Sequence, residues 1–200
     1  MYLRRSIFVL ACLLSLPLAA RAQDFGIAES AETINHRNFK LRLSPIVIFG
    51  NDNEANRTGF AATFGYGFTK SFDAEGQVAF YDGVTIYGGN AEWWIVKESP
   101  LDFSVAGGIH RRTGSKTADY TGVDLTFLAS GHVNKRLELY GGLDIAFEGV
   151  GDPGDYKTFH LVPGLEYKIN ESIDLDVEFG IALNDFARHY LCGGLSFYIR

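Results

Sequence analysis

The amino-acid sequence predicts an all-β fold, namely a single antiparallel up-and-down barrel of about ten strands. From residue 39 onward, apolar residues alternate with polar or small ones, a period of two that places them on opposite faces of a strand. The connections alternate between short turns and longer loops, so the short turns gather at one end of the barrel. No later run approaches the ~20 apolar residues of a membrane-spanning helix.

The segment 173–183 shows the alternation most clearly. Its odd positions are all Ile, Leu, Val or Phe, whereas its even positions are Asp, Glu, Gly or Ala. Because a helix would scatter both sets around its circumference, the segment is predicted to be a strand. Its eleven residues exceed the usual strand of a soluble protein and match the length that a tilted strand needs to cross a bilayer.

Residues 1–22 are predicted to be a signal peptide that is removed on export. Arg4 and Arg5 precede the apolar run 7–18, and the small residues within 20–22 are typical of a cleavage site. Cleavage after residue 22 removes three arginines, so 15 of the 18 basic residues remain against 24 acidic ones and the net charge goes from −6 to −9. This charge argues against nucleic acid as a partner, since nucleic-acid binding needs a basic surface.

Residues 23–38 form a short lead-in that departs from the strand pattern. Ile27, Ala31 and Ile34 recur at helical spacing, which indicates either an irregular segment or a marginal amphipathic helix. A functional lead-in would act as a plug or as an anchor at the membrane surface, whereas a structural one would be an ordinary chain terminus. The predicted barrel then spans residues 39–200.

Ten alternating segments follow, and none carries a charged residue on its apolar face. Short connections follow the second, fourth, sixth and eighth segments, and most of the others are longer and rich in Gly, Asp and Asn. The exception is Asp82-Gly83, a pair typical of a tight hairpin turn; if no hairpin forms there, the barrel has eight strands. The predicted strands are 39–50, 58–69, 72–81, 84–96, 101–110, 122–133, 137–148, 158–169, 173–183 and 189–200.

Alternation alone does not decide which face points inward. A soluble binding barrel would bury the apolar face, whereas a membrane barrel would expose it to lipid. The polar face carries many small residues, such as Gly65 and Gly180, which suit a narrow lumen. Aromatic residues fall near both ends of the apolar faces, as in the two aromatic girdles of membrane barrels. We therefore predict that the apolar face contacts lipid.

The last segment adds a family resemblance. Gly194 is followed at plus three by Phe197 and at plus five by Ile199, which resembles the C-terminal signal of outer-membrane proteins. That signal ends on an aromatic residue, whereas here Ile199 takes its place and Arg200 extends beyond it. Residues 39–200 thus resemble a small, porin-like outer-membrane β-barrel of Gram-negative bacteria. The resemblance implies contact with outer-membrane lipid and lipopolysaccharide, insertion by the barrel-assembly machinery, and a role as pore, enzyme, adhesin or structural protein.

Hairpin pairing brings charged inward residues together near the short turns. Lys168 falls opposite Asp174, and Glu166 falls opposite Asp176. The contact between the first and last strands adds further bases. The predicted lumen set comprises the acidic cluster Glu166, Asp174, Asp176 and Glu178 and the basic partners Lys40, Arg42, Lys168 and Arg200.

Two interpretations of the lumen remain open. A lattice of buried ion pairs would fill it, because a buried charge needs a partner. Alternatively, the surplus of acids would favour small ions or solutes of positive charge in a narrow channel. Twelve carboxylates are predicted to point inward: Asp73, Glu75, Glu92, Asp102, Asp124, Glu138, Asp144, Glu148, Glu166, Asp174, Asp176 and Glu178.

Four residues near the longer loops are candidates for acid–base chemistry, since a histidine beside a carboxylate can act as a general base. The sequence has neither the Asp-x-His pair of omptin-like proteases nor the His-x-Ser-Asn stretch of lipid-A deacylases, so an outer-membrane hydrolase is the less favoured alternative. We therefore assign no catalytic residue, metal ligand or cofactor. The four candidates are His110, Asp124, Glu148 and His160.

The longest predicted loop, 111–121, offers a surface for an interaction function. It carries Arg111, Arg112 and Lys116, which could contact the phosphates of lipopolysaccharide. Basic loop residues are also ordinary solvated surface, so the loop by itself does not define a binding site.

Overall fold

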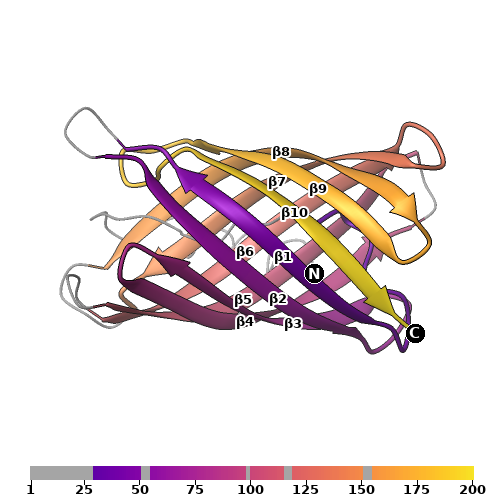
Figure 1. Ribbon diagram of the computed structural model, residues 1–200, viewed down its shortest axis with the longest axis horizontal. Coiled ribbons are helices and arrows are strands. Elements are labelled where there is room, and N and C mark those ends of the chain that lie inside the picture. Colours follow the sequence, from indigo (N-terminus) through magenta and orange to yellow (C-terminus); the bar gives the residue numbers. More distant parts are fainter. Residues whose placement is uncertain (1–28, 51–54, 98–99, 115–118, 151–154) are drawn as a thin grey trace, which may run out of the picture.

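The computed structural model describes residues 29–50, 55–97, 100–114, 119–150 and 155–200. Within them it forms a closed barrel of ten antiparallel strands, in which each strand pairs with its sequence neighbours and β1 pairs with β10 (Figure 1). The predicted fold class is confirmed, while the predicted signal peptide, residues 1–22, lies outside the described residues. The strands are β1 (Phe39–Ile48), β2 (Arg57–Gly67), β3 (Phe72–Tyr81), β4 (Val84–Val96), β5 (Asp102–Gly114), β6 (Tyr120–His132), β7 (Leu137–Glu148), β8 (Tyr156–Asn170), β9 (Ile173–Ala182) and β10 (Tyr190–Ile199).

The turn that decides the strand count joins β3 to β4. Tyr81 pairs with Val84, and the two residues between them, Asp82 and Gly83, have φ angles of 32° and 83°. Two positive φ angles are typical of the hairpin turn whose twist matches that of the flanking strands, and Gly and Asp tolerate them better than most residues. The hairpin therefore forms, and the ten-stranded prediction is confirmed over the eight-stranded alternative.

The connection between β5 and β6 is shorter than the predicted loop 111–121. The ladder continues through the pairs Arg111–Thr121 and Arg112–Tyr120. Residues 111–121 were predicted to be a loop because they are mostly polar and lack an apolar face. Backbone pairing nevertheless continues beyond the lipid-facing part of the two strands.

This extension corrects the expected lipopolysaccharide contact. Arg112 is buried inside the barrel, so it is not available to a phosphate at the surface. Arg111 stays about half exposed, and its Nη2 lies 3.7 Å from Asp119 Oδ2. Lys116 lies outside the described residues.

The apolar side chains of the strands point outward and the polar ones inward. On β2, Phe64 is 54% exposed while Thr63 is buried, and on β7, Leu143 is 40% exposed while Asp144 is buried. An outer wall of large apolar side chains is stable in hydrocarbon rather than in water, so the barrel crosses a membrane with its strands. Among the residues that the structure describes, no helix is long and apolar enough to span a membrane.

The two ends of the barrel differ in their connections. One end, here called the short-turn rim, holds the turns after β2, β4, β6 and β8 and the C-terminus, which lies at the right of Figure 1. The opposite end, the long-loop rim, holds the remaining connections. Short turns face the periplasm in bacterial outer-membrane barrels, so we assign the short-turn rim to that side.

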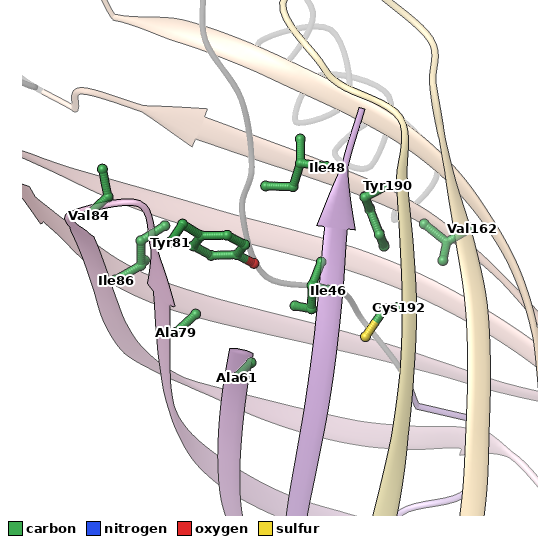
Figure 2. Close-up of a cluster of buried hydrophobic side chains, with 10 residues drawn as sticks. All are labelled: Ile46, Ile48, Ala61, Ala79, Tyr81, Val84, Ile86, Val162, Tyr190 and Cys192. Atoms are coloured by element: carbon green, nitrogen blue, oxygen red, sulfur yellow. The ribbon is translucent and has the colours of Figure 1, made fainter. Parts of the chain in front are cut away.

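An apolar layer lies inside the barrel, toward the long-loop rim (Figure 2). This layer was not predicted from the sequence, although Ile46 and Ile48 share the inward phase of Lys40 and Arg42 on β1. The ring of Tyr81 points toward Ile46 across the interior in Figure 2. The layer comprises Ile46, Ile48, Ala61, Ala79, Tyr81, Val84, Ile86, Val162, Tyr190 and Cys192.

Inward glycines make room for the aromatic rings of this layer. A Cβ atom at Gly180 would overlap the ring of Tyr190, and a Cβ atom at Gly59 would overlap the ring of Tyr81. The interior is closely packed, so there is no free space for the added Cβ atoms. At Gly180 and Gly59 the small residue is thus required by one particular aromatic ring.

Candidate functional site in the barrel lumen

Acidic side chains outnumber basic ones in the lumen. Among the described residues, eleven Asp or Glu residues and three Lys or Arg residues are buried. Ten of the twelve carboxylates predicted to point inward belong to this set, and Asp124 and Glu166 are partly exposed. The buried acids are Glu29, Asp73, Glu75, Glu92, Asp102, Glu138, Asp144, Glu148, Asp174, Asp176 and Glu178, and the buried bases are Lys40, Arg42 and Arg112.

The acidic cluster has the cross-strand register that the hairpin turn predicts. Glu166 pairs with Asp176 across β8 and β9. Hydroxyl groups hydrogen-bond the deeper members: Ser196 Oγ donates to Asp176 Oδ2 at 2.7 Å, and Tyr140 OH donates to Glu178 Oε2 at 3.2 Å. Both carboxylates are 1% exposed, so neutral donors supply part of the stabilisation that the sequence assigned to bases.

Two of the predicted basic partners, Lys40 and Arg42, are buried in the lumen. Lys40 Nζ lies 3.2 Å from Glu75 Oε1 and 3.6 Å from Glu29 Oε1. Arg42 Nε donates a hydrogen bond to Ser44 Oγ at 3.1 Å. Lys40 therefore joins β1 both to β3 and to the chain segment that precedes β1.

The other two predicted partners, Lys168 and Arg200, lie at the short-turn rim. Lys168 faces Asp174 in the strand register, but its Nζ and Arg200 Nη2 each lie 4.0 Å from Glu171 Oε2. The side chain of Arg200 is 71% exposed, so it lies at the open end of the lumen. Arg200 follows the last residue of β10, where strand alternation no longer fixes the direction of a side chain.

A chamber of about 540 Å³ opens at the short-turn rim. Two members of the acidic cluster, Glu166 and Asp174, line it together with Lys40 and Lys168, whereas Asp176 and Glu178 lie deeper in the barrel wall. Eight carboxylates and five Lys or Arg side chains line the chamber in all, so its lining is net negative. The carboxylates are Glu29, Glu32, Asp73, Glu92, Glu138, Glu166, Glu171 and Asp174, and the bases are Lys40, Lys135, Arg136, Lys168 and Arg200.

Residues 29–38, here called the N-terminal segment, lie in the mouth of this chamber. The segment is irregular and contains a turn at 36–37. The predicted lead-in 23–38 therefore has no helix within residues 29–38, and residues 23–28 lie outside the described residues. Ala31 is fully buried and Ile34 is 5% exposed. Gly65 and Gly67 of β2 leave the space that the segment occupies, because a Cβ atom at either position would overlap it.

Hydrogen bonds to lumen side chains fix the segment. The backbone N–H of Ile34 donates to Asp73 Oδ2 at 2.6 Å, and that of Ala31 donates to Ser130 Oγ at 3.1 Å. Burial raises the pKa of Glu29 well above its ordinary value; the nearby Glu75 adds to the rise, and Lys40 opposes it. The segment is thus a bound part of the lumen and contributes an acid of its own.

Three of the four predicted acid–base candidates come together beneath the long-loop rim. His110 Nδ1 lies 2.7 Å from Asp124 Oδ2, and His110 Nε2 lies 2.8 Å from Glu148 Oε2. Gly122 provides the space, since a Cβ atom there would overlap both His110 and Glu148. The imidazole therefore bridges β5, β6 and β7 inside the wall of the barrel.

The same three residues are covered on the side of the long-loop rim. Arg112 Nη1 donates to Tyr120 OH at 3.0 Å, and Tyr156 OH donates to Tyr120 OH at 2.8 Å. The fourth candidate, His160, is fully buried on β8 and its Nε2 lies 2.9 Å from the carbonyl oxygen of Arg188, so it serves a different part of the lumen. Burial places these histidines in the packed lumen, away from the exposed rim where the hydrolase alternative expected them.

Fold and lumen together define a small transmembrane β-barrel with an acidic interior. A family model described as the outer membrane protein beta-barrel domain matches residues 7–190, and the chain belongs to this family. It is therefore a protein of the bacterial outer membrane, as the sequence predicted. No curated protein matches the chain.

Solved structures with a similar fold include channel proteins. An outer membrane channel from Pseudomonas putida F1 is 10% identical, with a TM-score of 0.55 over 88% of this chain and 100% of that chain. The KdgM porin is 12% identical, with a TM-score of 0.48 over 80% of this chain and 99% of that chain. The Yersinia pestis outer membrane protein Ail is 12% identical, with a TM-score of 0.44 over 82% of this chain and 100% of that chain. At these identities the similarity concerns the fold.

Proposed function

We propose that this outer-membrane barrel is a narrow, weakly conducting channel that prefers small cations. The observation that carries the proposal is the charge of the lumen, where eleven buried carboxylates face three buried Lys or Arg side chains. Buried carboxylates without enough bases need positive charge from elsewhere, because an uncompensated buried charge is costly. Mobile cations, protons included, provide that charge, and rings of Asp and Glu favour cations in pores.

The acids form a sequence of positions through the barrel. Glu166 and Asp174 line the chamber at the short-turn rim. Asp176 and Glu178 follow along β9, and Asp144 and Glu148 continue along β7 toward the long-loop rim. A cation entering from the periplasm would therefore meet carboxylates at successive depths.

A second candidate function is that of a structural barrel with a filled lumen. Two observations favour it: the apolar layer of Figure 2 occupies the interior toward the long-loop rim, and the N-terminal segment lies in the mouth of the chamber. Conduction through such a lumen needs movement of side chains or of the segment. The two candidates therefore differ in a single measurable property, the passage of ions.

Planar-bilayer recording on the purified barrel tests the proposal. In a salt gradient, the reversal potential should show cation preference. The double variant Asp176→Asn with Glu178→Gln should shift it toward zero, because two fixed negative charges leave the lumen. The control Asp82→Asn with Asp185→Asn removes the same charge from exposed loop positions and should leave the preference unchanged.

Each alternative has its own signature in this experiment. A complete absence of conductance would favour the filled structural barrel. Conductance with anion preference would mean that the buried bases, and not the acids, control the path.

A further inference from the structure

A cluster of three potential metal ligands lies at the short-turn rim, apart from the deep acids of the channel path. Glu32 belongs to the N-terminal segment, His132 ends β6 and Glu138 lies at the start of β7. His132 and Glu138 are direct partners in the strand register. One ligand atom from each of the three side chains lies within 4.8 Å of the others.

The individual distances show how the three groups meet. His132 Nε2 lies 3.0 Å from Glu32 Oε1, and His132 Nδ1 lies 3.7 Å from Glu138 Oε2. The side chains of Glu32 and His132 are 38% and 56% exposed, so an ion can reach them from the periplasm. All three residues line the chamber, which provides the space beside them.

Glu138 supplies a second and independent observation. Its side chain is 4% exposed, and its Oε1 atom is buried without a hydrogen-bond partner among the described residues. A buried carboxylate oxygen without a donor is destabilising, since it has lost water and gained nothing. A bound cation would satisfy it.

We propose that Glu32, His132 and Glu138 bind a divalent transition-metal ion, best represented by Zn²⁺, which ties the N-terminal segment to the barrel wall. Imidazole nitrogens and carboxylate oxygens are both zinc ligands, with bonds of about 2.0–2.2 Å. Tetrahedral ligands at such distances lie about 3.3 Å apart. The two carboxylates now contact different ring nitrogens of His132, so binding requires the exposed side chains of His132 and Glu32 to turn until one nitrogen and both carboxylates face the ion. The imidazole favours Zn²⁺ over Ca²⁺ and Mg²⁺, which take oxygen ligands.

The position of Glu32 gives the site a consequence beyond binding. This ligand comes from the N-terminal segment, and the other two come from the barrel wall. An ion that needs all three ligands therefore stabilises the state in which the segment is bound in the lumen over a state in which it has left the lumen. No metal site was predicted from the sequence, since Glu32 and His132 are 100 positions apart and no ligand spacing joins them. Any effect of the ion on conductance rests on the proposed channel function, whereas the site itself does not.

Zinc titration of the untagged protein, purified from outer membranes in detergent and stripped with a chelator, tests the site. Calorimetry should give one Zn²⁺ ion per chain. His132→Gln and Glu32→Gln should each weaken binding at least tenfold. The control His36→Gln changes an exposed histidine of the same segment and should leave the affinity within twofold.

Trypsin cleavage after Arg37, an exposed residue of the N-terminal segment, reports whether the ion holds the segment in place. Zn²⁺ should slow this cleavage in the wild type and in His36→Gln, and not in Glu32→Gln. Absence of saturable zinc binding, or equal loss in His36→Gln and His132→Gln, would overturn the site. Unchanged affinity in Glu32→Gln would overturn the tie to the segment. A barrel that binds zinc and conducts no ions would leave this proposal standing and refute the channel.

Discussion

Single side chains of this barrel face either lipid or a packed lumen, and adjacent positions show the contrast. On β7, Leu143 is 40% exposed on the outer wall, whereas Asp144 is 1% exposed and accepts a hydrogen bond from Thr126 Oγ1 at 2.7 Å. The two sides impose opposite requirements: hydrocarbon outside excludes charge, and close packing inside limits volume. Substitutions on the two sides therefore fail for different reasons.

The lipid-facing side predicts the effect of a charge on the outer wall. Leu143→Arg and Val177→Arg, both at outward mid-strand positions, should each lower the free energy of unfolding in bilayers by about 2–4 kcal/mol. Denaturant titration in lipid vesicles measures this loss, with Leu143→Met as the volume-matched control. A neutral Leu143→Arg would contradict the assignment of faces.

The lumen-facing side predicts the effect of a single methyl group. Gly180→Ala should destabilise the barrel by about 1–3 kcal/mol, because the new Cβ atom would overlap the ring of Tyr190 and force it to move. Gly141→Ala is the matched control, since a Cβ atom there meets nothing within 4 Å. The same denaturant titration should give a lower free energy of unfolding for Gly180→Ala than for Gly141→Ala. Equal values would mean that the lumen beside Gly180 can accommodate a methyl group.

The N-terminal segment is the element whose role depends most on its contacts. Ile34 is its main apolar anchor, and the neighbouring Asn35 is exposed. Ile34→Asp should release the segment, because it would bury a further carboxylate in a lumen already rich in acids. Trypsin cleavage after Arg37 should then become at least tenfold faster, and conductance should rise if the channel proposal holds.

A matched control for that variant is Asn35→Asp, which adds the same charge at an exposed position of the same segment. It should leave the cleavage rate within about twofold, because surface substitutions rarely disturb packing. Equally faster cleavage in both variants would show that net charge, and not the burial of the Ile34 side chain, holds the segment in place.

For the molecule as a whole, closure of the barrel is the condition for stability in lipid. β1 and β10 pair from Phe39–Ile199 to Ile48–Tyr190, so the backbone groups of the first and last strands are hydrogen-bonded where the barrel closes. An open sheet edge in hydrocarbon would leave N–H and C=O groups unpaired at a cost of several kcal/mol each. The intact protein should therefore fractionate with outer membranes and migrate anomalously in gels unless it is boiled.

Removal of residues 189–200 tests this condition. The shortened chain lacks β10, so β1 and β9 are left as edges and the unboiled sample should lose its anomalous mobility. Removal of residues 29–35, which leaves every strand intact, is the matched control and should preserve it. A shortened chain that still runs as a folded species would show that closure is not required.

The parts of the fold that depend on local alternation could be predicted from the sequence. Period-two patterning gave ten strands and their outward faces, and short turns set the register that pairs Glu166 with Asp176. Alternation assigns each side chain to a face, but it does not say which side chains meet across the lumen from strands that are not neighbours. The approach of Tyr81 of β3 to Ile46 of β1, and the position of Glu32 beside His132, therefore follow from the tertiary structure. Those contacts depend on how the barrel closes and on the space that inward glycines leave, and both are properties of the whole circle of strands.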